Sequence, residues 1–175
     1  NVELHTGDLG FAGINAGSWL PRFYSACKVL CESMGKTVAD FLGPDVGAAA
    51  ESVVAAFANA QEKAVKDKIG KHRKDFKAKP LEEQSKLAEE AERRTAMLRL
   101  GAVAHDCPAC GSKGVLTGNL IKELEPVYED GELLVDLEYL ANEFRCFACY
   151  LHLTTIDEVG LAGINLRFTE KTATS

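Results

Sequence analysis

The sequence predicts an α+β protein in which an α-helical N-terminal region precedes a small β region. Three observations support this prediction. Apolar residues recur with helical spacing in the first part of the chain, the spacing becomes that of strands after His105, and four cysteines fall in the β region as two C-x-x-C pairs. With 175 residues, 46% of them hydrophobic, the chain can form one domain or two small ones. We therefore expect a helical region over residues 1–104 and a separate domain over residues 105–175.

The helical region begins with a glycine-rich segment, residues 1–20, which indicates loop or short extended pieces. A helix is expected over residues 21–34, and a short helical turn over residues 37–42. The expected apolar stripe of the first helix consists of Phe23, Cys27, Leu30 and Met34. Cys27 and Cys31 lie four residues apart, which suits either core packing or a second metal site, and the stripe favours core packing.

Two long helices are expected next. Asp45 can cap a helix that continues to residue 78, and Pro80 then suits the first turn of another helix. The apolar face of this second helix consists of Leu87, Ala91, Thr95, Leu98 and Ala102. Long helices joined by a tight turn predict an antiparallel helical hairpin, which also offers a surface for a homo-oligomer.

Short apolar pieces follow in the C-terminal part of the chain. A Glu-Asp-Gly-Glu turn at residues 129–132 predicts a β-hairpin, and Thr155 with Glu158 predicts a capping box at the start of a short helix. The expected strands cover residues 115–120, 133–137, 144–147 and 166–169.

The two C-x-x-C pairs are the most specific feature of the sequence. Cys107 and Cys110 form the first pair, and Cys146 and Cys149 form the second. Two thiolates separated by two residues can hold one tetrahedral ion from a tight turn, and the second pair completes the coordination. Four sulfur ligands favour zinc. Metal thiolates also favour a reducing compartment, and we expect the protein in the cytoplasm.

In these residues the chain resembles the zinc-ribbon class, whose members carry two such knuckles on β-hairpins. The resemblance covers about residues 104–153 and implies a zinc-ribbon domain at the C-terminus. The second knuckle departs from the pattern, because Tyr150 stands where glycine usually follows the second cysteine. Four cysteines fill a tetrahedron, which favours structural zinc over catalytic zinc. His105 and His152 flank the knuckles and are expected to remain outside the ligand set.

Charge is segregated along the chain, whose formal net charge is -6. Residues 62–79 hold eight basic and three acidic side chains, whereas residues 123–143 hold eight acidic side chains and no lysine or arginine. Lys71, Arg73 and Lys74 could contact a phosphate backbone, including that of DNA, or form an ordinary solvated helix face.

Arg99 and His105 form an Arg-x(5)-His pair near the end of the second long helix. The pair resembles the R-x(4-6)-H signature of HEPN ribonucleases, in which the histidine acts in acid–base chemistry and the arginine supports the phosphate. Alternatively, Arg99 complements the C-terminal end of the helix dipole.

Taken with the absence of other catalytic motifs, these patterns favour a non-enzymatic zinc-stapled interaction module. Its partner would be a protein or a nucleic acid. An RNA-cleaving enzyme that uses Arg99 and His105 is the alternative function. No run of apolar residues is long enough to cross a membrane, so no membrane partner is expected.

Overall fold

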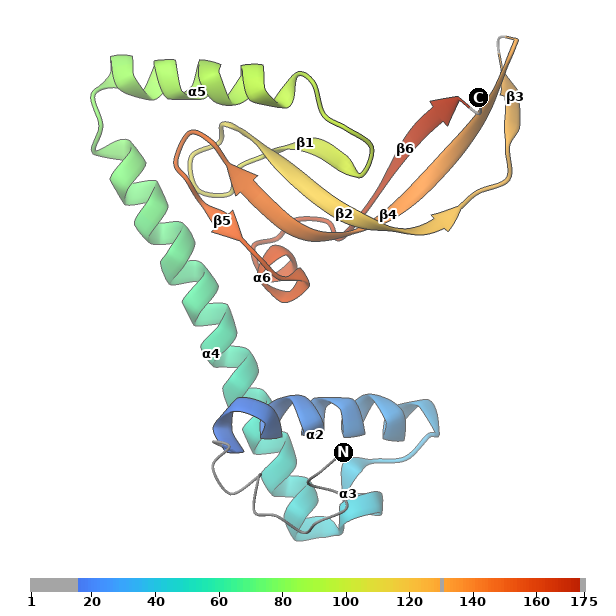
Figure 1. Cartoon of the computed structure of the whole chain (residues 1–175). Helices are drawn as coiled ribbons and strands as arrows, with labels where there is room; N and C mark the ends of the chain where they lie inside the picture. The colour runs from blue at the N-terminus through green and yellow to red at the C-terminus, as the bar shows by residue number, and fades with distance from the viewer. Residues whose placement is uncertain (1–15, 130, 174–175) are drawn as a thin grey trace, which may run out of the picture. The chain divides into compact units, whose positions relative to one another are not determined.

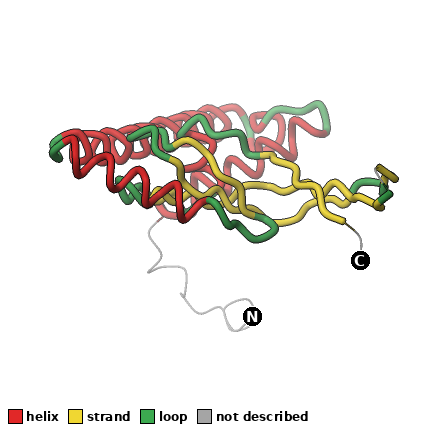
Figure 2. Tube along the Cα trace, turned by 90° about the horizontal axis from the view of Figure 1, so that it is seen from above, coloured by secondary structure: helices red, strands yellow, loops and turns green. Residues whose placement is uncertain are grey.

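The computed structural model describes residues 16–129 and 131–173 (Figures 1 and 2). The α+β class is confirmed, because helices precede a sheet of antiparallel strands. The chain divides into two compact units, Asn1–Gln61 and Glu62–Ser175, which are described separately. The loop expected for residues 1–15 lies outside the described residues, and residues 16–20 belong to the first described helix. No helix in the described part of the chain is both long and apolar enough to cross a membrane.

The first unit contains α2 (Ala16–Ser33), α3 (Val38–Leu42) and the beginning of α4 (Pro44–Lys77). A capping box starts α3, in which the Thr37 hydroxyl accepts a hydrogen bond from the Asp40 backbone N–H and the Asp40 carboxylate accepts one from the Thr37 N–H. Gly47 allows α4 to approach α3 closely, since a Cβ at this position would lie 2.6 Å from the Ala39 Cα. The short helix expected over residues 37–42 is thus confirmed.

The prediction that the apolar stripe of the first helix is buried is wrong. Phe23, Leu30 and Met34 are 47%, 63% and 66% exposed, whereas Cys31 is 3% exposed and Cys27 is half-buried. Helix α3 packs near the end of α2, where Cys31 lines a hollow together with Asp40 and Phe41. A buried Cys31 agrees with the interpretation of this cysteine as a core residue.

The second unit starts in α4, which ends at Lys77, and continues with α5 (Leu81–Thr95). The tight turn at Pro80 is as expected, but the two helices diverge from it instead of lying antiparallel side by side (Figure 1). Phe76 of α4 and Ala91 of α5 are both buried in the core that the strands form. The C-terminal end of α4 and the buried face of α5 therefore pack into the core that the strands form, and not along one another.

The second long helix is shorter than expected. It ends at Thr95, and Ala102 is the first residue of strand β1 (Ala102–Asp106). Gly101 before this strand has φ +83°, in the left-handed region that glycine enters without a steric penalty. The apolar spacing of Leu98 and Ala102 reflects their packing after the helix and not a further helical turn.

The second unit contains one antiparallel sheet (Figures 1 and 2). Its remaining strands are β2 (Lys113–Glu123), β3 (Val127–Glu129), β4 (Glu132–Cys146), β5 (His152–Leu153) and β6 (Arg167–Ala173). Strand β4 is central, because Leu134 pairs with both β3 and β6, and Phe144 pairs with both β2 and β5. Strands β2 and β3 thus follow one edge of β4, β5 and β6 follow the other, and β1 pairs with β2.

Two of the expected strands are parts of one. The pieces over residues 133–137 and 144–147 are joined in β4, because Leu137, Tyr139 and Ala141 continue the alternation of buried side chains between them. The hairpin between β3 and β4 and the C-terminal strand β6 are confirmed. Helix α6 (Ile156–Leu161) is also confirmed, with Thr155 as its N-cap.

The core of this unit lies at the end of the sheet that carries the cysteines. Its largest fully buried side chains are Phe144, Leu116, Leu151, Leu153, Val159 and Cys146. Gly114 makes room for the ring of Phe144, because a Cβ at this position would lie 2.5 Å from the Phe144 Cζ. The core and the cysteine site therefore share their walls.

Candidate metal centre

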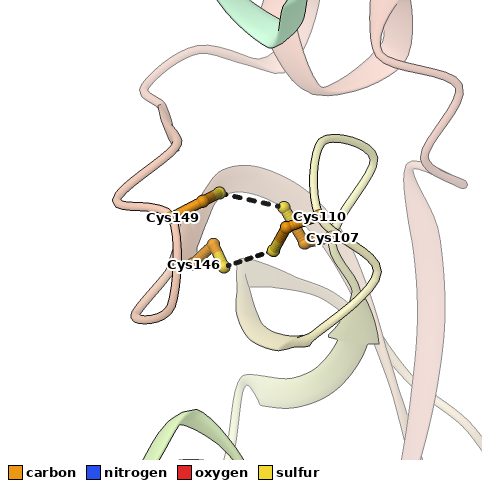
Figure 3. Close-up of side chains that lie close together, drawn as sticks. All are labelled: Cys107, Cys110, Cys146 and Cys149. Carbon is orange, nitrogen blue, oxygen red and sulfur yellow. Dashed lines mark hydrogen bonds between the residues drawn. The ribbon is translucent and has the colours of Figure 1, made fainter. Parts of the chain in front are cut away.

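The sheet brings the four cysteines of the second unit to one place (Figure 3). Cys107 and Cys110 lie in the loop between β1 and β2, Cys146 ends β4, and Cys149 lies in the loop before β5. Gly114 at the start of β2 pairs with Cys146 at the end of β4, so the two loops meet at the same end of the sheet. Neighbouring antiparallel strands thus provide both halves of one site.

The geometry of the four sulfur atoms suits a tetrahedral ion. The Cys107 and Cys149 Sγ atoms are 3.6 Å apart, as are those of Cys110 and Cys146, and all four lie within 4.8 Å of one another. A tetrahedral zinc ion with Zn–S bonds of about 2.3 Å requires sulfur–sulfur distances of about 3.8 Å. A disulfide would need about 2.05 Å, and all four cysteines are free. The four cysteines are therefore positioned to bind a metal ion.

The first knuckle is fixed by backbone hydrogen bonds. The Gly111 N–H donates to the Cys107 carbonyl at 2.9 Å, and the Cys107 N–H donates to the Ser112 carbonyl at 2.9 Å. The Ala109 N–H lies 3.4 Å from the Cys107 Sγ, where it can stabilise a thiolate. Gly111 leaves the turn with φ +79°, as its place after the second cysteine requires.

The second knuckle has the same turn with a different residue at its exit. The Cys146 N–H donates to the Leu151 carbonyl at 2.9 Å, which matches the bond from Cys107 to Ser112 in the first knuckle. Tyr150 has φ +61°, and no other non-glycine residue in the described part of the chain has a positive φ. The knuckle therefore keeps its geometry without glycine, at a steric cost of about 1–2 kcal/mol for a side chain in this conformation.

The thiols affect each other strongly. Hydrogen bonds with Cys107 and Cys149 lower the pKa of Cys110 well below its ordinary value and lower the pKa of Cys146 to about 7. Hydrogen bonds within the cluster, reinforced by burial, raise the pKa of Cys107 and Cys149. A metal ion bound among them would supply the positive charge that lets all four thiols ionise.

Two consecutive residues of α4 hold both knuckles from outside. The Arg73 guanidinium donates to the Pro108 carbonyl at 2.7 Å and to the Ala109 carbonyl at 3.2 Å, both in the first knuckle. His72 donates from Nδ1 to the Cys149 carbonyl at 2.8 Å, in the second knuckle. This contact of His72 is not predictable from the sequence, in which His72 is one more residue of a long helix. A His-Arg pair on a helix is too common a pattern to indicate such contacts.

The basic residues proposed for a phosphate backbone have different surroundings. Lys71 and Lys74 are exposed on α4, in keeping with a solvated face or with a contact to an anion. Arg73 is also exposed, but its guanidinium is bound to the two carbonyls of the first knuckle. The three residues therefore do not form one set of free cations.

The structure does not bring Arg99 and His105 together. Arg99 lines a hollow with Glu143 and Arg145. The His105 ring lies edge-on to Phe144, with centroids 6.2 Å apart. Because successive side chains of β4 alternate between its faces, Phe144 projects to the face opposite Glu143 and Arg145. Arg99 and His105 thus lie toward different faces of the sheet.

The two histidines beside the knuckles lie outside the metal cluster, which consists of cysteines alone. The His105 Nδ1 donates a hydrogen bond to the Asp106 carbonyl, and the His152 Nε2 lies 2.7 Å from a Glu143 carboxylate oxygen.

Comparisons of the chain with protein-family models, with curated proteins and with solved structures find no match.

Proposed function

We propose that this protein is a non-enzymatic interaction module whose β domain is stapled by a structural zinc ion, in the manner of a zinc ribbon. The observation that carries the proposal is the cluster of four sulfur atoms within 4.8 Å of one another. All four ligands come from the chain, so no coordination position is left for a substrate or a reactive water. Zinc thiolates also need a reducing compartment, which supports a location in the cytoplasm.

The surroundings of the cluster support a structural ion. Cys107, Cys146 and Cys149 are 4%, 0% and 7% exposed. Buried ligands in a fixed cage suit an ion that remains bound while the protein works. The stapled domain then presents a rigid surface, which would bind a protein or nucleic-acid partner.

The proposal is tested by metal analysis of the purified chain and its variants. We expect one zinc ion per chain, and we expect Cys146→Ser to lose the metal. Cys27→Ser is the matched control, because Cys27 lies in the first unit and outside the cluster. Hydrogen exchange followed by mass spectrometry should show loss of protection in β2 and β4 of Cys146→Ser and of chelator-treated protein, while α2 is unchanged.

Two results would contradict the proposal. If a chelator removes the metal and β2 and β4 keep their protection, zinc does not staple the domain. If the purified chain holds no metal and binds none on addition of zinc, the cluster is not a metal site.

A further inference from the structure

A basic and aromatic groove lies on the second unit beside the metal centre, on the face of β4 that carries Arg145. It consists of two adjoining hollows of about 470 and 330 Å³ that share Arg94, Arg145 and Phe147 as walls. The larger hollow adds Arg99, and the smaller one adds Tyr150 and His152. We call these six residues the Arg–Tyr groove. It combines cations with aromatic rings along one continuous depression.

The positive charge of the groove is largely available to a ligand. The guanidinium groups of Arg99 and Arg145, both in the walls of the larger hollow, make no ion pair or hydrogen bond within the described part of the chain. Arg94 is bound to Glu90, with Nε 2.8 Å from a carboxylate oxygen, and its guanidinium lies 5.2 Å from the centre of the Phe147 ring. Glu143 is the one carboxylate in the walls, against three arginines, and one of its oxygens lies 2.7 Å from the His152 Nε2.

Tyr150 shows that the groove is maintained at a cost. Its backbone has φ +61°, where the first knuckle has glycine, and its ring is 66% exposed. A glycine would meet the demands of the turn without strain, and an exposed ring adds little packing. The strained position places a large aromatic side chain in the wall of the smaller hollow, where a ligand can contact it.

From these observations we infer that the Arg–Tyr groove binds single-stranded nucleic acid. Arg99 and Arg145 contact phosphates, and a base stacks on Tyr150. The inference rests on the proposed function, because the second knuckle, which places Tyr150, needs its metal ion. It also names a surface different from the helix face of Lys71 and Lys74.

The chemistry of the groove favours a single strand over other anions. An acidic peptide would use the guanidinium groups but would leave the exposed Tyr150 ring without a flat partner. A duplex keeps its bases stacked inside, so it too would leave the ring unused. Unpaired bases stack on aromatic side chains, and a backbone of phosphates follows a row of arginines.

The test uses the full zinc-loaded chain and fluorescent single strands of RNA and of DNA, each about 12 nucleotides long, in an anisotropy titration. We expect Tyr150→Gly to weaken binding about tenfold, and Tyr150→Phe to bind within about twofold of the wild type, since the ring is kept. Arg145→Ala and Arg99→Ala should each weaken binding and lower the salt dependence, by about 0.7 in the slope of log K against log salt concentration.

Control variants separate the groove from general charge. Lys122→Ala removes one positive charge from the distal part of β2, and Lys74→Ala removes one from α4; both should bind as the wild type. Zinc content and hydrogen exchange are measured on every variant, so loss of folding is not mistaken for loss of binding. A variant that has lost its zinc is replaced by one that removes the same group more mildly: Tyr150→Asn, because asparagine tolerates the positive φ of this position, or Arg145→Gln, which removes the charge and keeps most of the side chain.

Three outcomes would overturn the inference. The zinc-loaded chain binds neither strand, or Tyr150→Gly and Arg145→Ala bind as the wild type, or a polyglutamate peptide or a duplex binds as well as the single strands. In each case the zinc content remains normal, so the proposed zinc-stapled module survives. Absence of zinc from the wild-type chain would instead contradict the proposed function.

Discussion

Arg73→Ala should weaken zinc binding although Arg73 touches no sulfur atom. The Arg73 side chain makes two hydrogen bonds to carbonyls of the first knuckle, at 2.7 and 3.2 Å. In the alanine variant these carbonyls accept hydrogen bonds from water instead, and α4 no longer holds the loop that carries Cys107 and Cys110. The perturbation therefore separates the support of the metal site from its ligands.

The magnitude follows from the geometry of the two bonds. A hydrogen bond to a charged group contributes about 1.5–3 kcal/mol when buried, but Arg73 is exposed, so water replaces much of each bond. We assign about 1 kcal/mol to the short bond and about 0.5 kcal/mol to the long one. Because the knuckle folds as it binds the ion, the sum of about 1.5 kcal/mol lowers zinc affinity about tenfold.

Competition with a chromogenic chelator measures the zinc affinity directly. Lys74→Ala is the matched control, because Lys74 is the next residue of α4, is also exposed, and contacts neither knuckle. Arg73→Lys should give an intermediate affinity, since an ammonium group reaches only one of the two carbonyls at a time. Equal zinc affinities for Arg73→Ala and Lys74→Ala would refute the reasoning.

Two further predictions concern the stability of the second unit. Gly114→Ala should destabilise it by about 1–3 kcal/mol in chemical denaturation, because the Phe144 ring must move. Gly70→Ala, on open helix surface, should instead stabilise it by about 0.5–1 kcal/mol. Equal effects of the two substitutions would contradict the packing described for Gly114. Burial raises the pKa of Glu158, but the hydrogen bond from the Thr154 N–H and the Lys68 ammonium outweigh burial. The net pKa of Glu158 is therefore below its ordinary value. Its contribution, about 0.5 kcal/mol, is therefore present above about pH 4.5 and lost as pH falls below this, so the stability difference between wild type and Glu158→Gln should vanish in acid; a constant difference would count against the pair.

The sequence predicted those features that depend on local spacing. These features are the two C-x-x-C pairs, the capping residue Thr155 and the turn before β4. Each depends on residues that are close together in the chain, so the residue types alone predict it. The expected end of the second long helix is wrong because Leu98 and Ala102 keep a helical apolar spacing although the helix has already ended at Thr95. Periodicity does not distinguish packing of a loop from packing of a helix.

Contacts between distant residues were not predictable. His72 and Arg73 reach knuckles that follow them by more than 30 residues, and nothing in a basic helix identifies a carbonyl as the partner. The arrangement of α4 and α5 likewise depends on a core to which Phe76 and Ala91 contribute and whose other side chains come from later segments of the chain. The direction of a charged side chain is set by the tertiary fold, so composition alone overstates how many cations are free.

Tyr150 is a residue at which the local sequence pattern and the tertiary structure both contribute to the interpretation. Its place after Cys149 was visible in the sequence as a departure from the usual glycine, and the structure shows that the turn is kept and the ring exposed. If the ring served only the fold, replacement by glycine would relieve a strain of about 1–2 kcal/mol and remove little packing. Glycine also makes the unfolded chain more flexible, at a cost of about 0.5–1 kcal/mol, so the variant should be as stable as the wild type or slightly more stable. A Tyr150→Gly variant that keeps its stability and loses affinity for single strands would therefore assign the ring to a ligand of the Arg–Tyr groove, whereas a clear loss of stability would assign the ring to the fold.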